Sequence, residues 1–200
     1  MVKRARCPSC TRPLALCYCS LLPSLHNHWP VQIMQYSAEA KHALGTARIA
    51  ALGLTNAWLT PYTPITSKPE EAGSLPCALI YPSDSSDDLQ VLAEEPAHHL
   101  IVLDGTWKKS KRMLLESPYL ADIPHYRLPA VESSRYRIRK EPTPQSVSTL
   151  EAIVTALGVL EDRQEYYHPL LKVMDALIEQ QTSRMPKDVL RDNYPSNKDC

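Results

Sequence analysis

The sequence predicts an α/β domain built on a largely parallel β-sheet. Short apolar runs bounded by turn-forming residues alternate with longer segments whose apolar residues recur at helical spacing. The 200 residues are 44% hydrophobic, which is enough for one buried core. We expect a metal-binding segment over 1–25, one α/β domain over 26–184 and a tail over 185–200.

The N-terminal segment has the clearest metal-binding pattern. Cys7, Cys10, Cys17 and Cys19 lie within thirteen residues, and four thiolates can complete a tetrahedral zinc site. The alternatives are two disulfides or free thiols, but a cytosolic chain rarely keeps disulfides. A metal with four protein ligands braces a fold and does not catalyse.

Other residues bear on this metal site. Because the Cys-x-Cys half is tighter than most zinc knuckles, His26 or His28 could replace one ligand. Cys77 and Cys200 are distant and are expected to be plain thiols.

The first half of the domain alternates predicted strands and helices. Lys41 and Arg48 lie off the apolar stripe of its first long helix. In order, we expect a strand over 31–36, a helix over 39–54, a strand over 56–59, a proline-rich loop over 60–76, a strand over 78–81 and a short helix over 85–93.

The central stretch is a buried strand over 100–103 that leads into a basic helix. Asp104 and Gly105 form the turn between them, and Thr106 can cap the helix. We expect Trp107 on the apolar side of that helix, with its lysines largely on the other side. In open α/β sheets ligands bind where strands end, so Asp104 is a candidate site residue. The alternative is an ordinary Asp-Gly turn beside a core tryptophan.

A strand is expected over 126–128, between two prolines, and an arginine-rich segment over 133–140 follows it. If that segment is extended, Arg135, Arg137 and Arg139 share one face, where guanidinium groups suit phosphates. The alternative is an edge strand kept charged against pairing.

A long helix is expected from Ser148 to Leu160, because Ser148 and Glu151 form a capping box. The free N–H groups of such a helix start also suit an anion, although the capping role alone explains the sequence. A last helix is expected over 169–182.

The net charge is zero, but the charges are segregated along the chain. Residues 104–140 carry nine basic and four acidic side chains, which suits a polyanion-binding face, although chance clustering on a solvated surface is the alternative. The apolar runs are too short to span a membrane and no signal peptide is evident, so we expect a cytoplasmic protein. With five glycines, the chain has neither a Walker nor a Rossmann phosphate loop.

Several motifs resemble those of the DTW-domain proteins, and they follow one another along the chain in the same order as in that family. Asp104-Gly105-Thr106-Trp107 matches the Asp-x-Thr-Trp signature of that family, and Ser148-Thr149-Leu150-Glu151-Ala152 matches its second signature. The matches extend from residue 7 to about residue 160. They also include the four N-terminal cysteines, Ala78-Leu79-Ile80-Tyr81-Pro82-Ser83, the Lys41, Thr46 and Arg48 helix, and Tyr136-Arg137-Ile138-Arg139.

The chain departs from the family pattern in the early helix. A His-Pro pair often precedes the Glu there, whereas Tyr36-Ser37-Ala38 precedes Glu39 here. Gly45 stands where an Asn is common, and Ser110 where a small Ala is common. The departures weaken any role assigned to residues 36–45 and leave the central stretch untouched.

The resemblance implies a tRNA-uridine aminocarboxypropyltransferase, which moves the 3-amino-3-carboxypropyl group of S-adenosylmethionine to N3 of a uridine. It also implies a SPOUT-like sheet with a C-terminal trefoil knot that holds S-adenosylmethionine, and a structural zinc. The expected partners are tRNA and S-adenosylmethionine, with no membrane, and the oligomeric state stays open. A SPOUT-like RNA methyltransferase and a non-catalytic, zinc-containing RNA-binding protein are the alternatives.

The implied site residues fall into three groups. The catalytic candidates are Asp104, Thr106 and Trp107. The candidates for S-adenosylmethionine binding are Tyr81, Pro82, Leu103, Asp104, Gly105, Leu128, Ser148, Thr149 and Glu151. The RNA-binding candidates are Lys41, Arg48, Lys108, Lys109, Lys111, Arg112, Arg135, Arg137 and Arg139.

Each group has an expected role. Asp104 would accept the N3 proton or orient the base, and Trp107 would stack on uracil or adenine. The Thr106 and Ser148 hydroxyls would bind the methionine carboxylate or the base, and the helix start at Ser148 and Thr149 suits that carboxylate. The basic residues would position tRNA phosphates.

Overall fold

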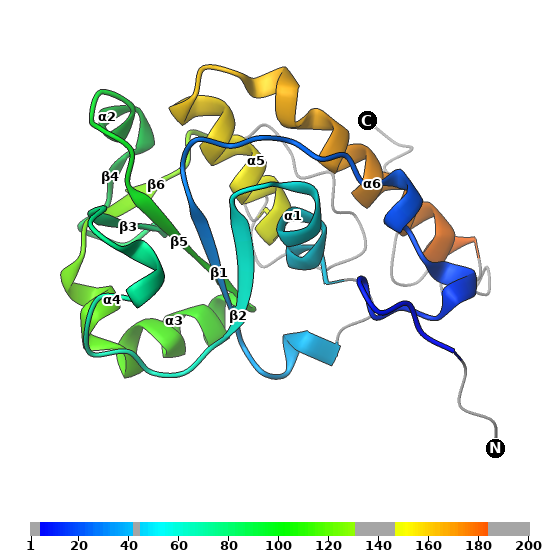
Figure 1. Ribbon diagram of the computed structural model, residues 1–200. Coiled ribbons are helices and arrows are strands. Elements are labelled where there is room, and N and C mark those ends of the chain that lie inside the picture. The colour runs from blue at the N-terminus through cyan, green and yellow to red at the C-terminus, as the bar shows by residue number, and fades with distance from the viewer. Residues whose placement is uncertain (1–4, 42–44, 131–146, 184–200) are drawn as a thin grey trace, which may run out of the picture.

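The computed structural model describes residues 5–41, 45–130 and 147–183, and its strands form a six-stranded sheet (Figure 1). The strand order is β2-β1-β5-β3-β6-β4, and each of these pairings is parallel. The predicted α/β class with a parallel sheet is therefore confirmed. The strands are β1 (Val31–Gln35), β2 (Ala57–Pro61), β3 (Cys77–Ile80), β4 (Asp87–Asp88), β5 (His99–Asp104) and β6 (His125–Arg127).

Helices cover both faces of the sheet. The α-helices are α1 (Ala47–Gly53), α2 (Leu89–Ala93), α3 (Trp107–Glu116), α4 (Pro118–Asp122), α5 (Thr149–Leu160) and α6 (Gln164–Thr182). The short 3-10 helices are η1 (Leu14–Leu16), η2 (Cys19–Leu21), η3 (Glu39–Lys41) and η4 (Glu70–Ala72).

The alternation of side chains along β5 divides the interior into two cores. Leu100 and Val102 face a large core that also contains buried residues of α1, α2, α5 and α6. Ile101 and Leu103 face a smaller core that includes Met113 of α3. All six residues of β5 are buried, as expected for a central strand of a parallel sheet covered on both faces.

Three elements differ from the predictions. The helix expected over 39–54 is divided into η3 and α1, and residues 42–44 between them lie outside the description. The helix expected from 85 begins only at Leu89, because β4 first pairs with β6. The last helix begins at Gln164, before the expected start, and contains Pro169 in its interior, because its buried side chains outweigh the missing backbone hydrogen bond.

A helix that was not predicted, α4, follows α3 directly. Ser117 ends α3, and Pro118 then occupies the first helical position, where a missing N–H costs nothing. The arginine-rich segment 133–140 and the tail 185–200 lie outside the described residues.

The end of β5 is a topological switch point. The chain leaves the neighbouring strands β1 and β3 toward α1 and α2, in the large core, but leaves β5 toward α3, in the smaller core. Connections that diverge in this way leave a crevice at the carboxyl ends of the strands, where ligands bind in open α/β sheets. Asp104 is the last residue of β5. None of the helices in the described ranges is long and apolar enough to span a membrane.

Candidate functional site

The carboxylate of Asp104 forms the centre of the candidate site. Asp104 is 7% exposed, and among the described residues the side chains of Gln35 and Thr149 donate to its oxygens. The Gln35 amide nitrogen lies 2.7 Å from Oδ2, and the Thr149 hydroxyl lies 2.6 Å from Oδ1. These bonds join β1, β5 and the first residue of α5 at one edge of the sheet.

The contact between Asp104 and Thr149 unites the two sequence motifs. Asp104 and Thr149 are 45 residues apart in the chain. The sequence pattern predicted the strand or helix next to each residue, but not that the two residues meet. The structure therefore brings together Asp104 and Thr149 of the predicted site. It adds Gln35, which sequence reasoning missed, although its position at the end of a predicted strand was a usable signal.

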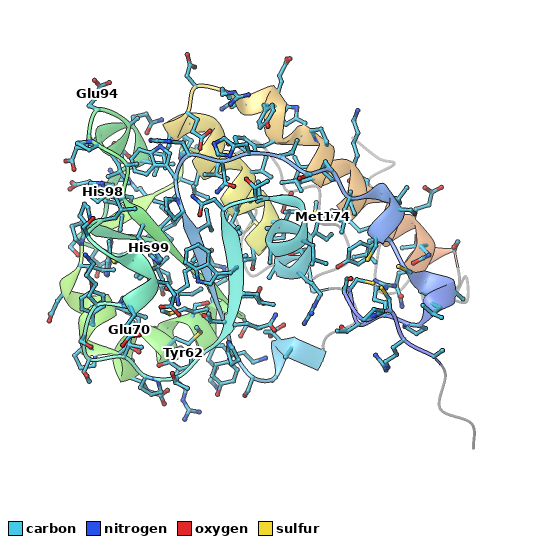
Figure 2. All side chains as sticks on the ribbon, viewed as in Figure 1. Tyr62, Glu70, Glu94, His98, His99 and Met174 are labelled. Atoms are coloured by element: carbon cyan, nitrogen blue, oxygen red, sulfur yellow. The ribbon has the colours of Figure 1, made fainter. Side chains whose placement is uncertain are left out.

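The start of α5 is held by the predicted capping box, which the structure confirms. The Ser148 backbone N–H donates to the Glu151 carboxylate at 2.7 Å, and the Glu151 N–H donates to the Ser148 hydroxyl at 3.3 Å. The Ser148 hydroxyl also contacts the sulfur of Met174 on α6 (labelled in Figure 2) at 3.6 Å. The polar groups of Ser148, Thr149 and Glu151 thus hold the protein's own structure together.

Trp107 starts α3 beside the end of β3. Its side chain is 43% exposed, so the alternative that it is a core residue is wrong, as is its expected place with the buried face of α3. The Tyr81 ring lies 5.9 Å away, centroid to centroid, at a tilt of 57°. Thr106 caps the helix as predicted, because its hydroxyl accepts from the Lys109 N–H at 3.3 Å.

The remaining candidates for S-adenosylmethionine binding surround this edge in different environments. Leu103 is buried in the smaller core, and Leu128 packs against the large one. Pro82 is exposed. A Cβ at Gly105 would lie 3.0 Å from the Lys109 Cβ, so the first turn of α3 approaches this residue closely.

An ion pair lies at the same edge of the sheet. The Lys109 ammonium is 2.7 Å from a Glu39 carboxylate oxygen and 5.6 Å from the centre of the Tyr36 ring. The Glu39 side chain is 11% exposed and the Lys109 side chain 31%. Lys109 therefore directs its charge toward η3, and Glu39 is a second site residue that sequence reasoning missed.

The other RNA-binding candidates that the structure describes lie on α3, α1 and η3. Lys108, Lys111 and Arg112 are exposed on α3, and Arg48 is partly buried on α1. Glu116, 2.7 Å from the Arg112 guanidinium, raises the pKa of Arg112. Lys41 belongs to η3. Arg135, Arg137 and Arg139 lie outside the described residues.

A buried polar group lies on β5 at the opposite edge of the sheet. His99 (Figure 2) is fully buried, and its Nε2 lies 3.0 Å from the Gln32 amide oxygen. The Gln32 amide nitrogen in turn donates to the Thr60 hydroxyl at 3.3 Å, so His99 Nε2 is the donor. Burial lowers the pKa of His99 to about 4. Within the described part of the chain, His99 Nδ1 has no hydrogen-bond partner.

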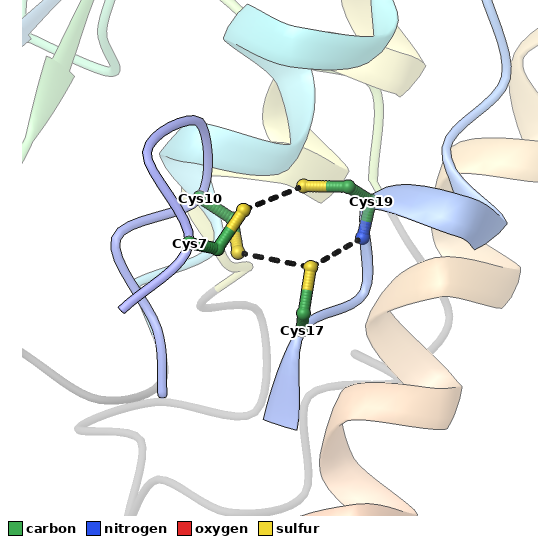
Figure 3. Close-up of side chains that lie close together, drawn as sticks. All are labelled: Cys7, Cys10, Cys17 and Cys19. Carbon is green, nitrogen blue, oxygen red and sulfur yellow. Dashed lines mark hydrogen bonds between the residues drawn. The ribbon is translucent and has the colours of Figure 1, made fainter. Parts of the chain in front are cut away.

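Four cysteine sulfurs form a candidate metal centre at the N-terminal segment (Figure 3). All four lie within 4.8 Å of one another, with Cys7 and Cys19 3.6 Å apart and Cys10 and Cys17 3.7 Å apart. A tetrahedral zinc with Zn–S bonds of about 2.3 Å places its sulfurs about 3.8 Å apart. Since none of these cysteines is in a disulfide, the donor set and its spacing fit a metal ion.

The thiols of this cluster are already electrostatically biased. The N–H groups of Cys10 and Ser9 donate to the Cys7 sulfur and lower the pKa of Cys7 to about 6. Burial and the neighbouring thiols raise the pKa of Cys19 to about 12. A cation would relieve the repulsion among four thiolates. The predicted substitute ligands are not used, because His26 Nδ1 contacts the Thr55 hydroxyl and neither His26 nor His28 joins the cluster.

Comparison with known proteins identifies related sequences. The sequence profile of the DTW domain matches residues 4–182. A Drosophila melanogaster protein, tRNA-uridine aminocarboxypropyltransferase 2, is 31% identical over 200 residues, which cover 90% of this chain and 76% of that protein. A Macaca fascicularis protein of the same name is 27% identical, with 88% and 63% covered. The Arabidopsis thaliana tRNA-uridine aminocarboxypropyltransferase A is 26% identical, with 88% and 80% covered.

Proposed function

The chain belongs to the DTW domain family, and from this membership we propose that it is a tRNA-uridine aminocarboxypropyltransferase. We propose that its donor is S-adenosylmethionine and that the acceptor atom is N3 of a uridine. The observation that carries the proposal is the contact between Asp104 and Thr149, which places a buried carboxylate at the switch point of the sheet.

Asp104 would act on the proton of uridine N3. N3 is a weak nucleophile until this proton leaves, and a carboxylate can accept the proton or orient the base. Gln35 donates to Oδ2 and Thr149 donates to Oδ1, and these two hydrogen bonds hold the carboxylate in one orientation. Asp104 is thus oriented before the substrates arrive, which lowers the entropic cost of the reaction.

Tyr81 and Trp107 would provide a surface for a base. Both rings border the end of β5 from adjacent elements, and a partly exposed aromatic ring can stack on uracil or adenine. S-adenosylmethionine, when bound, supplies the carbon that N3 attacks and takes the electron pair of the broken carbon–sulfur bond, which releases neutral methylthioadenosine.

The basic side chains of α3 would position tRNA. Lys108 and Lys111 are exposed next to Trp107, and phosphate contacts orient a nucleic acid without reading its sequence. We propose the same role for the other candidates: Lys41, Arg48, Lys109, Arg112, Arg135, Arg137 and Arg139.

The cysteine cluster would hold zinc in a structural role. Four thiolates leave no position for substrate on a tetrahedral ion. We also propose a cytoplasmic location, because a reducing compartment keeps such thiols available to bind a metal. We further propose that the sheet belongs to the SPOUT class and that the C-terminal part of the chain forms its trefoil knot.

Incubation of the protein with tRNA and S-adenosylmethionine, followed by chromatography of nucleosides and small molecules, tests the function. We expect aminocarboxypropyl-uridine and methylthioadenosine in equal amounts. A reaction without tRNA is the control, because S-adenosylmethionine also decomposes spontaneously to methylthioadenosine.

Two results would contradict the proposal. Equal amounts of methylated nucleoside and S-adenosylhomocysteine would identify a methyltransferase. The absence of both products, with tRNA still bound, would identify a non-catalytic RNA-binding protein.

A further inference from the structure

Glu39 and Lys109 form an ion pair at the sheet edge, and the mechanism above gives Glu39 no role and Lys109 only a contact with tRNA phosphate. Two backbone bonds place it there: the Tyr36 N–H donates to the Asp104 carbonyl at 3.0 Å, and the Glu39 N–H donates to the Tyr36 carbonyl at 2.8 Å. Lys109 reaches it from the first turn of α3, which Asp104 and Gly105 precede. Both charges therefore lie close to the carboxyl end of β5.

The environment of this pair is unlike that of a surface ion pair. The Glu39 and Lys109 side chains are 11% and 31% exposed, whereas the equally short pair of Arg112 and Glu116 on the outer face of α3 is 64% and 35% exposed. Removing two charges from water is unfavourable, so a partly buried pair is weak support for stability. It is well suited, however, to a ligand that carries both charges, because much of its desolvation has already occurred in the free protein.

We propose, on the basis of the proposed function, that Glu39 and Lys109 bind the zwitterionic end of the donor. Glu39 would accept hydrogen bonds from the α-ammonium group, and Lys109 would donate to the α-carboxylate. The ion pair between Glu39 and Lys109 would then be replaced by an ion pair of each side chain with the ligand, and the zwitterionic end itself adds no net charge.

The start of α5 is a weaker candidate than Lys109 for binding the α-carboxylate of the donor. The Ser148 and Thr149 hydroxyls already contact Met174 and Asp104, and the Ser148 N–H is used by the capping box. None of these groups supplies a full positive charge, whereas Lys109 does.

Glu39 and Lys109 would thus act as a clamp on the two charged groups of the donor. This clamp would also distinguish the two transfer reactions that S-adenosylmethionine allows. In aminocarboxypropyl transfer the ammonium and carboxylate belong to the group that moves, so holding both ends of that group directs its reacting carbon toward N3. In methyl transfer the same charges stay on the departing molecule. Glu39 and Lys109 are thus positioning residues for the transferred chain.

The test is calorimetric binding of three ligands to the intact protein. S-adenosylmethionine carries both charges, decarboxylated S-adenosylmethionine carries only the ammonium, and methylthioadenosine carries neither. Glu39→Gln should weaken the first two ligands roughly ten- to a hundredfold, as expected for a lost charge-assisted hydrogen bond, and leave methylthioadenosine unchanged. Lys109→Met should weaken only S-adenosylmethionine.

Matched variants control for net charge and for folding. Glu116→Gln removes a carboxylate from an ion pair of the same length, and Lys172→Met removes an exposed lysine from α6, so both should bind all three ligands as the wild type does. Methylthioadenosine is the internal control, because a misfolded site would lose it as well.

Four outcomes would overturn the inference. Equal weakening of all three ligands would make the pair structural, and unchanged S-adenosylmethionine binding by both Glu39→Gln and Lys109→Met would remove it from the site. Wild-type protein that binds S-adenosylmethionine no more tightly than methylthioadenosine would reject the clamp while leaving the transferase proposal intact. Wild-type protein that binds no S-adenosylmethionine would overturn both.

Discussion

At the scale of single residues, Asp104 is more buried and more firmly hydrogen-bonded than a turn residue needs to be. Its carboxylate is buried, and Gln35 and Thr149 donate to its two oxygens. Buried carboxylates are normally stabilised by such donors, but here the donors come from two elements far apart in the chain. The arrangement therefore orients the carboxylate relative to both β1 and α5.

Asp104→Asn should lower the transfer rate about a hundredfold or more, the usual contribution of a general base. The amide keeps the shape of the side chain but removes the charge, and its NH₂ group cannot accept from the donor it faces. The measurement is single-turnover transfer to tRNA, with S-adenosylmethionine binding determined in parallel. Binding should survive, because the carboxylate acts on the base.

Two substitutions of Thr149 test whether its hydroxyl group contributes to the role of Asp104. Thr149→Ser keeps the hydroxyl on Asp104 and should remain close to wild type, whereas Thr149→Val removes it and should share part of the loss. Near-normal turnover by Asp104→Asn would show that Asp104 is an ordinary turn residue.

His99 makes stability depend on pH. Its pKa falls from an ordinary value near 6.5 to about 4 in the folded protein, because the imidazole is fully buried. Between these values the unfolded chain binds a proton that the folded chain does not, so stability decreases as the pH falls from 6.5 to 4. The decrease attributable to His99 is up to about 3 kcal/mol, because each pKa unit corresponds to about 1.4 kcal/mol.

His99→Gln should therefore flatten the pH dependence of urea unfolding between pH 6.5 and 4. Gln cannot titrate, but it can still donate to Gln32. The exposed His28 is the control, and His28→Gln should keep the wild-type slope. An unchanged slope in His99→Gln would show that this histidine titrates normally.

At the scale of elements, the close packing of α5 on the start of α6 explains a glycine in the middle of a helix. Gly158 is an interior residue of α5, where glycine costs about 1 kcal/mol relative to alanine. A Cβ at this position would lie 2.8 Å from the Gln164 Cγ and 3.0 Å from the Gln164 Cα. Because the Cα belongs to the backbone of α6, the helix itself would have to move.

Gly158→Ala should therefore destabilise the protein by about 1–3 kcal/mol, despite the better helix propensity of alanine. Chemical denaturation followed by circular dichroism measures the change. Thr155→Ala tests propensity on the same helix at a partly exposed position and should be neutral or slightly stabilising. If Gly158→Ala is more stable than the wild type, the two helices do not approach as closely as this.

At the scale of the whole molecule, the N-terminal segment is part of the main core. Cys7, Cys10 and Tyr18 are buried in the same cluster as residues of α1, α5 and α6. Arg12 also reaches Gln180 on α6, at 3.3 Å. A metal held by these cysteines would therefore support the α/β domain as well as its own segment.

Purified protein should contain about one zinc per chain, and removing it with a chelator should lower the melting temperature of the whole molecule. Elemental analysis and thermal unfolding measure the two effects. Cys17→Ser should reduce the metal content, whereas Cys77→Ala, which removes a thiol outside the cluster, should not. Metal-free protein with oxidised cysteine pairs and an unchanged melting temperature would contradict the prediction.

The sequence alone determined the elements whose signals are local. A strand of four apolar residues before Asp104, a capping box at Ser148 and four cysteines at close spacing each depend on neighbours in the chain, and the structure confirms their geometry. Where tertiary contacts compete with local preference, the predictions failed. Trp107 is exposed although helical spacing placed it with the core, and α6 continues through Pro169 because buried neighbours support it.

Only the tertiary structure decided which residues meet. Parallel strands pair across long connections, so the order that places β5 between β1 and β3 cannot be obtained from periodicity. That order brings Gln35, Asp104 and Thr149 together and sets Glu39 against Lys109. Side-chain pairing of this kind depends on distances in space, and those distances follow from the packing of the whole sheet between its two helical layers.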